Sequence, residues 1–166
     1  MNSSPKNRLK DYWHMLGPLL DRHRHEMKPE AVWQIEAGRD LTGTAVANAF
    51  ARHGELMQRM RLFQEKYEFL VCVVNQVPPF DAAIHWPRDI DGVKMENYLS
   101  WMKSAYWISA TFCPAISVPA GFTSDDLPVG MQIVGRYRDD VGVLQLAHAF
   151  ERATGFGRRR PEIALG

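Results

Sequence analysis

The chain has 166 residues and a formal net charge of +1, with 46% hydrophobic and 23% charged residues. This length and composition are those of an ordinary globular protein, so we expect residues 1–166 to form a single domain. The near-neutral charge argues against nucleic-acid binding. No stretch reaches the roughly 18 apolar residues that a membrane-spanning helix needs, so no membrane partner is expected.

The sequence from residue 10 to residue 67 has the apolar spacing of helices. Residues 1–9 lead into charged sequence rather than an apolar run, so we expect a disordered terminus and no signal peptide. Apolar residues recur at helical spacing from Lys10 to about His25. Gly17-Pro18 is expected to bend or interrupt this first helix.

Two further helices are expected before residue 68. Pro29 suits the first turn of a short helix that stops near Gly38. The longest helical pattern follows, from about Thr44 to Tyr67. Either Thr42 or Thr44 can cap its start with a side-chain oxygen.

The pattern changes to that of a strand at Phe69. Phe69–Val74 is a continuous β-prone apolar run, which is typical of a strand buried on both faces. Proline ends this strand within Gln76–Phe80, because proline cannot donate to a ladder. After a loop rich in Pro, Asp and Gly, a strong helix is expected from about Met95 to Ala110.

Two strands and a helix complete the chain. Ala115–Pro119 and Val129–Val134 are expected to be strands, joined by a turn over Gly121–Asp126. Asp139-Asp140 can start the last helix, because carboxylates stabilise the N-terminal end of the helix dipole. Gly155 can end this helix.

This order of elements predicts an α/β fold with a small mixed sheet of about three strands, flanked by helices. Such a sheet is small for so many helices, and one of its strands is apolar on both sides. Strands from elsewhere would complete it. We therefore expect an exposed apolar face that dimerisation or other association covers.

The segment from Cys113 to Gly135 carries a long motif. It reads Cys-Pro-Ala-Ile-Ser-Val-Pro-Ala-Gly-Phe, a polar turn, and then Leu-Pro-Val-Gly-Met-Gln-Ile-Val-Gly. Pro114 and Pro119 are expected to bracket the first strand and set its length. Gln132 is a polar residue within an apolar strand and must find hydrogen-bond partners if it is buried. The motif resembles the C-terminal signature of the amidase-signature family.

The resemblance extends from about Lys10 to the end of the chain and is strongest after Glu68. It implies a partial amidase-signature fold, formed by the C-terminal part of an enzyme that hydrolyses carboxylic amide C–N bonds. The family usually has Asp in place of Glu68 and often Pro in place of Val73. It commonly has Gly two residues before Pro114, where Phe112 adds bulk near the position of the substrate pocket in relatives.

The catalytic groups of the family have no counterpart in this sequence. Members use a serine nucleophile, a second serine in a cis peptide and a lysine base, and a Gly/Ser-rich segment supplies the oxyanion hole. The only adjacent serines here are Ser3-Ser4, in the terminus and without glycine. The sequence therefore assigns no catalytic residue and no cofactor, and we expect the chain to be catalytically incomplete alone.

Ser100 and Lys103 form a weaker catalytic candidate. The run from Ser100 to Lys103 matches the S-x-x-K of penicillin-recognising serine enzymes. On a helix the two side chains would be neighbours. The chain has no K-T-G or S-D-N partner element, so solvated helix residues are the favoured interpretation.

The resemblance also implies substrate-binding residues. In relatives, two segments form the acyl side of the site. One is the helix before the Pro-Ala-Ile-Ser-Val-Pro segment, and the other is the loop that follows the preceding strand. The corresponding residues here are Gln76, Trp101, Met102 and Tyr106. Large apolar side chains at these positions would favour a hydrophobic or aryl acyl group, whereas core packing is the alternative role for each aromatic.

The remaining reactive residues indicate no further site. Cys72 and Cys113 stand in apolar runs and are expected to be buried, reduced thiols of a cytoplasmic protein. His23 and His25 point to different faces of a helix, and no motif has metal-ligand spacing, so no metal is expected. Arg158-Arg159-Arg160 is expected to be a solvated tail.

Three functions remain open on the sequence alone. The chain can be the C-terminal part of a longer amidase, with its N-terminal catalytic region or further copies as partners and a small amide as substrate. It can be an amidase-derived binding or regulatory module that associates with a separate chain. The third function is a hydrolase that uses Ser100 and Lys103.

Overall fold

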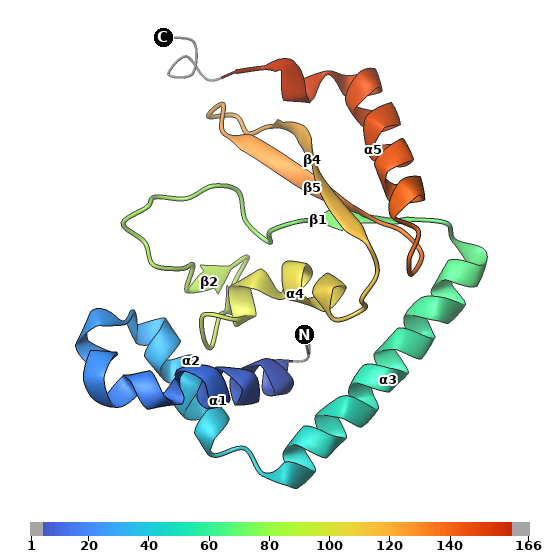
Figure 1. Ribbon diagram of the computed structural model, residues 1–166. Coiled ribbons are helices and arrows are strands. Elements are labelled where there is room, and N and C mark those ends of the chain that lie inside the picture. Colours follow the sequence, from blue (N-terminus) through green and yellow to red (C-terminus); the bar gives the residue numbers. More distant parts are fainter. Residues whose placement is uncertain (1–4, 161–166) are drawn as a thin grey trace. The chain divides into compact units, whose positions relative to one another are not determined.

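The computed structural model describes residues 5–160 of the chain (Figure 1). Its contacts divide the chain into two compact units, Met1–Met60 and Arg61–Gly166. The sequence predicted one domain that changes from helical to mixed at residue 68. The structure divides the chain earlier, within its longest helix.

The first unit begins with α1, Pro5–His23, which runs through Pro18 without a break. The prediction of an interruption at Gly17-Pro18 was therefore wrong. Residues 5–9, which were expected to be disordered, form the first turns of this helix, and Pro5 suits the first position because its missing N–H has no helical partner there. Residues 1–4 lie outside the described part of the chain.

The first unit continues with η1, Arg24–Glu26, and α2, Pro29–Arg39. Three buried side chains of α1 and α2 form its core: Leu20, Val32 and Ile35. An interior proline costs a helix about 3 kcal/mol, and packing of α1 on α2 offsets this cost. The second helix follows the prediction closely.

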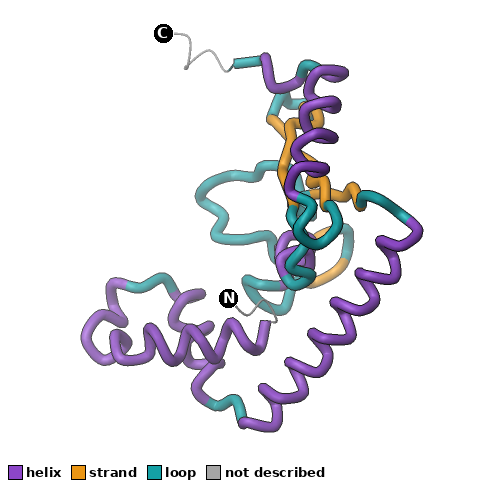
Figure 2. Tube along the Cα trace, turned by 45° about the vertical axis from the view of Figure 1, so that its right-hand side comes forward, coloured by secondary structure: helices purple, strands orange, loops and turns teal. Residues whose placement is uncertain are grey.

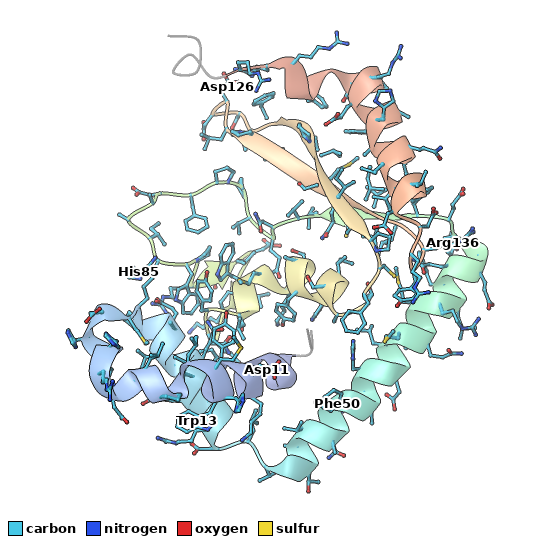
Figure 3. All side chains as sticks on the ribbon, in the orientation of Figure 1. Asp11, Trp13, Phe50, His85, Asp126 and Arg136 are labelled. Carbon is cyan, nitrogen blue, oxygen red and sulfur yellow. The ribbon has the colours of Figure 1, made fainter. Side chains whose placement is uncertain are left out.

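The long helix α3, Gly43–Lys66, starts with a side-chain cap. Thr42 Oγ1 accepts a hydrogen bond from the Ala45 N–H at 3.1 Å, which decides between the two predicted caps. The last turn of α3 belongs to the second unit. There the Gln64 side chain donates to the Gly135 carbonyl at 2.6 Å, and Arg136 donates to the Gln64 carbonyl at 3.2 Å (Figure 3).

The second unit is built on a three-stranded sheet of β1, Leu70–Val73, β4, Ala115–Phe122, and β5, Pro128–Val134. The strand order is β1-β5-β4 and both pairs are antiparallel. The helix α5, Asp140–Thr154, lies along β4 and β5 in both ribbon and tube views (Figures 1 and 2). This arrangement confirms the predicted α/β class and the small sheet, although all its strands are antiparallel rather than mixed.

The sequence predicted that β1 is buried on both faces, and this prediction is wrong. Its side chains alternate, and Val71 and Val73 are 49% and 56% exposed. The reason is topological, because β1 is an edge strand that pairs only with β5, while α5 packs against β4 and β5. A continuous apolar run does not distinguish an edge strand from a central one.

The strand β4 is longer than predicted and continues past Pro119. Its register with β5 is irregular between Pro119 and Gly121. Proline is tolerated here because β4 forms the other edge of the sheet, where the missing N–H breaks no central ladder. Pro119 therefore does not end the strand.

The expected helix from Met95 to Ala110 starts later than predicted, and its first turn is a 3-10 helix. A hairpin of β2, Asp89–Ile90, and β3, Val93–Lys94, precedes it. Only η2, Ser100–Met102, and α4, Lys103–Ser109, are helical.

A local hydrogen bond explains the late helix start. Asn97 Oδ1 accepts from the Leu99 N–H at 3.0 Å and from Ser100 Oγ at 3.3 Å. Such side-chain bonds to the following residues compete with helix formation. Regular α-helix starts only at Lys103, six residues after Asn97.

The helix α5 begins and ends as the sequence predicted. Asp139 Oδ1 accepts from the Gly142 N–H at 3.0 Å and caps its start. Gly155, at φ 67°, terminates it in the left-handed conformation. Its inward face contributes Ala147 to the core of the second unit, against Val118 and Ile133.

A buried amide joins the sheet to α4. Gln132 Nε2 donates to the Val73 carbonyl at 2.8 Å and to the Ser104 carbonyl at 3.2 Å. Ser104 Oγ donates in turn to the Val74 carbonyl at 2.8 Å. The partners predicted for a buried Gln132 are therefore present, and they fix the end of β1 against α4.

Phe112 lies in a strained turn between α4 and β4. Its φ is 57°, a left-handed conformation that costs a residue with a Cβ about 1–2 kcal/mol. The turn is held by Thr111, whose Oγ1 donates to the Ile108 carbonyl at 2.7 Å and accepts from the Cys113 N–H at 3.3 Å. Glycine, which the family commonly has here, adopts this conformation without strain.

The first prediction concerns this turn. Phe112→Gly should raise the free energy of unfolding by about 0.5–1 kcal/mol, because the relief of strain exceeds the added freedom of the unfolded chain. Urea unfolding of the 166-residue chain measures the change. Phe112→Ala is the matched control, since it removes the ring and keeps the strained Cβ. A glycine variant no more stable than the alanine variant would contradict the explanation.

The second prediction concerns the buried amide. Gln132→Leu should lower the free energy of unfolding by about 1–3 kcal/mol, because the carbonyls of Val73 and Ser104 lose a donor inside the protein. Thermal or urea unfolding measures the loss. The exposed Gln145→Leu on α5 is the control and should change stability by less than about 0.5 kcal/mol. Equal effects at the two positions would refute a specific role for Gln132.

Candidate functional site

The four predicted pocket residues lie on two segments of the second unit. Gln76 is in the loop that follows β1, Trp101 and Met102 are in η2, and Tyr106 is in α4. All four side chains are half-buried. They are therefore neither sealed in the core nor fully in solvent, which suits the wall of a binding site.

The hydrogen bonds of Gln132 and Ser104 bring these two segments together. Ser104 lies between Met102 and Tyr106 in sequence, and its Oγ binds the Val74 carbonyl, two residues before Gln76. Gln132 binds both sides of the same junction from β5. The start of the loop is thus anchored to the helix that carries Tyr106.

Trp101 is the centre of an aromatic cluster. Its ring centroid lies 5.6 Å from that of Phe80 and 6.2 Å from that of Tyr98, with interplanar angles of 84° and 78°. These are edge-to-face contacts, which add stabilisation beyond the buried area. Phe80 and Tyr98 were not among the predicted site residues, and contact with Trp101 is the only signal that associates them with it.

The Trp101 indole carries a buried hydrogen-bond donor. Its Nε1 has no hydrogen-bond partner among the described residues. A buried donor left unpaired costs about 1–3 kcal/mol, and such donors are rare. Trp101 therefore differs from an aromatic residue that only fills the core.

Tyr106 is suited to binding rather than to proton transfer near neutral pH. Burial raises the pKa of its phenol above the ordinary value, and a hydrogen bond with Trp107 opposes this only partly. Below that pKa the hydroxyl stays neutral, so it can donate or accept a hydrogen bond. Its ring also meets that of Trp107 edge to face at 6.4 Å.

The Ser100 and Lys103 pair lacks the geometry of an activated serine. Ser100 Oγ donates to Asn97 Oδ1 at 3.3 Å, so its proton points to an amide and not to a base. Ser100 lies in η2 and Lys103 begins α4, so one regular helix does not carry both. No Ser100–Lys103 hydrogen bond occurs in the part of the chain that the structure describes. Ser100 is buried rather than solvated as predicted, and its hydrogen bond to Asn97 gives it a structural role.

The two cysteines are free and half-buried, rather than fully buried as predicted. Burial raises the pKa of the Cys72 thiol, with a weaker opposing effect from its hydrogen bond to Gln132. A raised pKa makes this thiol a poor nucleophile at neutral pH. Within residues 5–160, no group of three His, Cys, Asp or Glu side chains is placed to hold a metal ion.

The basic segment Arg158-Arg159-Arg160 is not simply a solvated tail. Arg159 forms a two-point ion pair with Asp126, with one contact of 2.7 Å from Nη1 to Oδ1. Its guanidinium lies 4.1 Å from the ring centroid of Phe122. The guanidinium holds the pKa of the Asp126 carboxyl below its usual value. This contact attaches the end of the described chain to the β4–β5 turn (Figure 3).

A membrane-spanning helix is not found in the described residues, since no helix there is both long and apolar enough.

Comparison with known proteins gives consistent matches. Residues 14–144 match the family model described as Amidase. An acylamidase of Rhodococcus erythropolis is 32% identical over 150 residues, which cover 89% of this chain and 31% of the relative. A glutamyl-tRNA(Gln) amidotransferase subunit of Cupriavidus metallidurans is 28% identical over 153 residues, which cover 87% of this chain and 30% of the relative.

Comparison with solved structures also finds amidase-signature folds. A bacterial aryl acylamidase of the amidase signature enzymes superposes with a TM-score of 0.75 at 20% identity, over 94% of this chain and 37% of that chain. The chain thus spans about a third of the length of the relatives that it matches. Because the family model matches residues 14–144 and the fold agrees, this chain belongs to the Amidase family of amidase-signature proteins.

Proposed function

We propose that this chain is the C-terminal part of an amidase-signature enzyme that hydrolyses carboxylic amide C–N bonds. The family match over residues 14–144 carries the proposal, because it is continuous over most of this chain yet covers about 30% of the relatives. The segment from Cys113 to Gly135, which resembles the C-terminal signature, forms β4 and β5. The chain supplies scaffold, and a preceding region supplies the nucleophile and base.

The alternative of a non-catalytic regulatory module has less support. The matched relatives are named as an acylamidase and a component of an amidotransferase, and neither name denotes a regulatory protein. The hydrolase based on Ser100 and Lys103 lacks a base within reach of the serine. An amidase that requires further chain is therefore the favoured function.

The acyl side of the substrate site is proposed to include Gln76, Trp101, Met102 and Tyr106. Half-burial, the anchoring of both segments by Gln132 and Ser104, and the unpaired Trp101 N–H support this assignment. The aromatic edges of Phe80 and Tyr98 extend the apolar surface around Trp101. A hydrophobic or aryl acyl group suits such a wall better than a small charged one.

The proposed partners are the preceding catalytic region, a small amide substrate and further copies of this chain. A reducing compartment such as the cytoplasm is proposed from the two free cysteines.

The third prediction concerns catalysis by the chain alone. The purified 166-residue chain should release no amine from a panel of aryl and alkyl amides above the buffer blank, because no described serine is activated. Amine release measured by chromatography tests this result. Turnover that disappears in Ser100→Ala would overturn the assignment in favour of a Ser100 hydrolase.

The DNA immediately upstream of this coding sequence separates the first two functions. An in-frame lysine followed by a Gly/Ser-rich segment with paired serines would establish the amidase. A stop codon close upstream, with no such segment encoded, would leave the regulatory module.

The fourth prediction concerns acyl selectivity. In the complete enzyme, Trp101→Ala and Tyr106→Ala should each lower kcat/KM for aryl-acyl amides relative to acetyl amides by roughly tenfold, because apolar contact with the acyl group is lost. Competition between two amide substrates measures this ratio. Tyr137→Ala is the matched control, since that ring is 56% exposed and lies outside the proposed pocket residues. An unchanged ranking of substrates would exclude the two residues from the site.

A further inference from the structure

The segment that follows α5 turns back onto the sheet. Gly155 ends α5 in the left-handed conformation, and η3, Phe156–Arg158, follows it directly. This segment packs against β4, where the Phe156 ring lies 3.9 Å from the position that a Cβ at Gly121 would take. Residues 155–160 therefore lie against the last part of β4, and we call them the strap.

Arg159 attaches the strap to the turn between β4 and β5. Its guanidinium makes a two-point contact with Asp126 (Figure 3), in which Nη1 lies 2.7 Å from Oδ1. The same guanidinium lies 4.1 Å from the ring centroid of Phe122, the last residue of β4. A carboxylate bound at two points and an aromatic face suit the planar guanidinium of arginine better than the compact ammonium of lysine. The contact is therefore specific for arginine at this position.

The β4–β5 turn holds Asp126 in place for this contact. The Asp126 N–H donates to the Thr123 carbonyl at 3.0 Å, and the Thr123 N–H donates to the Leu127 carbonyl at 2.8 Å. The Leu127 N–H donates in turn to Thr123 Oγ1 at 3.1 Å. Asp126 has a φ of 68°, a conformation that Asp and Asn adopt more readily than most other residues with a Cβ. The turn itself fixes this residue, so closure of the strap does not have to order it.

The strap has little structure of its own. The Arg158 N–H donates to the Gly155 carbonyl at 3.1 Å, and the Arg159 N–H donates to the Phe156 carbonyl at 3.3 Å. Residues 157–160 are exposed. A helix of a single turn is not stable by itself, because its nucleation costs more than its few hydrogen bonds return. Contacts with β4 and with the turn therefore keep the strap closed.

We propose that the strap opens and closes as a unit, that the contact between Arg159 and Asp126 holds it closed, and that the closed strap protects Arg158-Arg159-Arg160 from trypsin-like proteases. Such proteases cleave after arginine and act on segments that open locally. In the closed strap, η3 precedes the peptide bond after Arg158 and the bound Arg159 follows it. This bond becomes a substrate only when the strap opens.

Limited trypsin digestion of the 166-residue chain tests the role of the contact. Asp126→Asn removes the charge and keeps a residue that tolerates the positive φ. It should speed release of the peptide 159–166 roughly twofold to fivefold, which corresponds to the strength of an exposed ion pair. The rate follows the population of the open strap when opening is fast. Asp125→Asn is the matched control, because it makes the same charge change at an exposed position of the same turn.

Mass spectrometry identifies the released peptides and their rates. The bond after Arg160 precedes Pro161 and is therefore resistant to trypsin, so the relevant products start at residue 159 or 160. Arg159→Lys keeps a residue that trypsin cleaves after but loses the planar group, so it should release peptide 159–166 faster than the wild type. A synthetic peptide of residues 153–166 gives the rate for an open strap, which the wild-type chain should not reach.

Hydrogen exchange tests the strap in the wild-type chain without any substitution. Exchange of the amides of residues 156–159 should become faster as sodium chloride is raised, because salt screens an exposed ion pair. The amides of β5 should keep their rates, because they lie in the central strand of the sheet.

Four results would overturn the proposal. The first is equal peptide release from Asp126→Asn and Asp125→Asn, and the second is a wild-type chain cleaved as fast as the synthetic peptide. The third is an exchange rate in the strap that salt does not change. The fourth is an Asp126→Asn chain whose β5 amides exchange as fast as the strap, because opening would then not be confined to the strap. None of these measurements depends on amide hydrolysis, so they test the strap separately from the proposed function.

Discussion

The relative position of the proposed site residues in the second unit depends mainly on one buried amide, with a second hydrogen bond from Ser104. Gln132 projects from β5 and donates to a carbonyl at the end of β1 and to another in α4. Without it, a strand paired on one side only and a seven-residue helix would share few fixed contacts. Because both carbonyls are removed from water, the amide can be replaced only by a group that donates to both. The loop with Gln76 and the helix with Tyr106 take their relative positions from these hydrogen bonds and from that of Ser104 to the Val74 carbonyl.

The polar role of Gln132 was readable from the sequence, and so were β4, β5 and α5. Local signals predict these elements: two strands on either side of a polar turn, an acidic start at Asp139 and a glycine end at Gly155. The structure contradicts the sequence predictions for two kinds of reason, and the first is local. The late start of α4 reflects Asn97, whose side-chain hydrogen bonds compete with the helix. The β2–β3 hairpin turns at Asp91-Gly92, a hairpin signal within the segment predicted to be a loop.

The second kind of reason is the order of the strands in the sheet, which no short stretch of sequence determines. The exposure of Val71 and the tolerance of Pro119 depend on which strands form the edges of the sheet. Strand order is a property of the whole fold, and one apolar run fits a central or an edge position equally well. The same limit applies to the site. The sequence motif pointed to Trp101 and Tyr106, but only packing shows that Phe80 and Tyr98 surround Trp101.

The open edge of the sheet lies next to the proposed acyl wall. The β4 edge carries Pro119, an irregular register and the η3 segment, whereas the β1 edge carries none of these among the described residues and is open to another strand. The bare β1 edge is directly followed by the loop that carries Gln76, so whatever covers β1 also approaches the proposed acyl wall. Under the proposed function, an amide bond beside that wall is cut only when a base from the preceding region has activated a hydroxyl. Completion of the sheet and delivery of the nucleophile are therefore expected to occur on the same side of this unit.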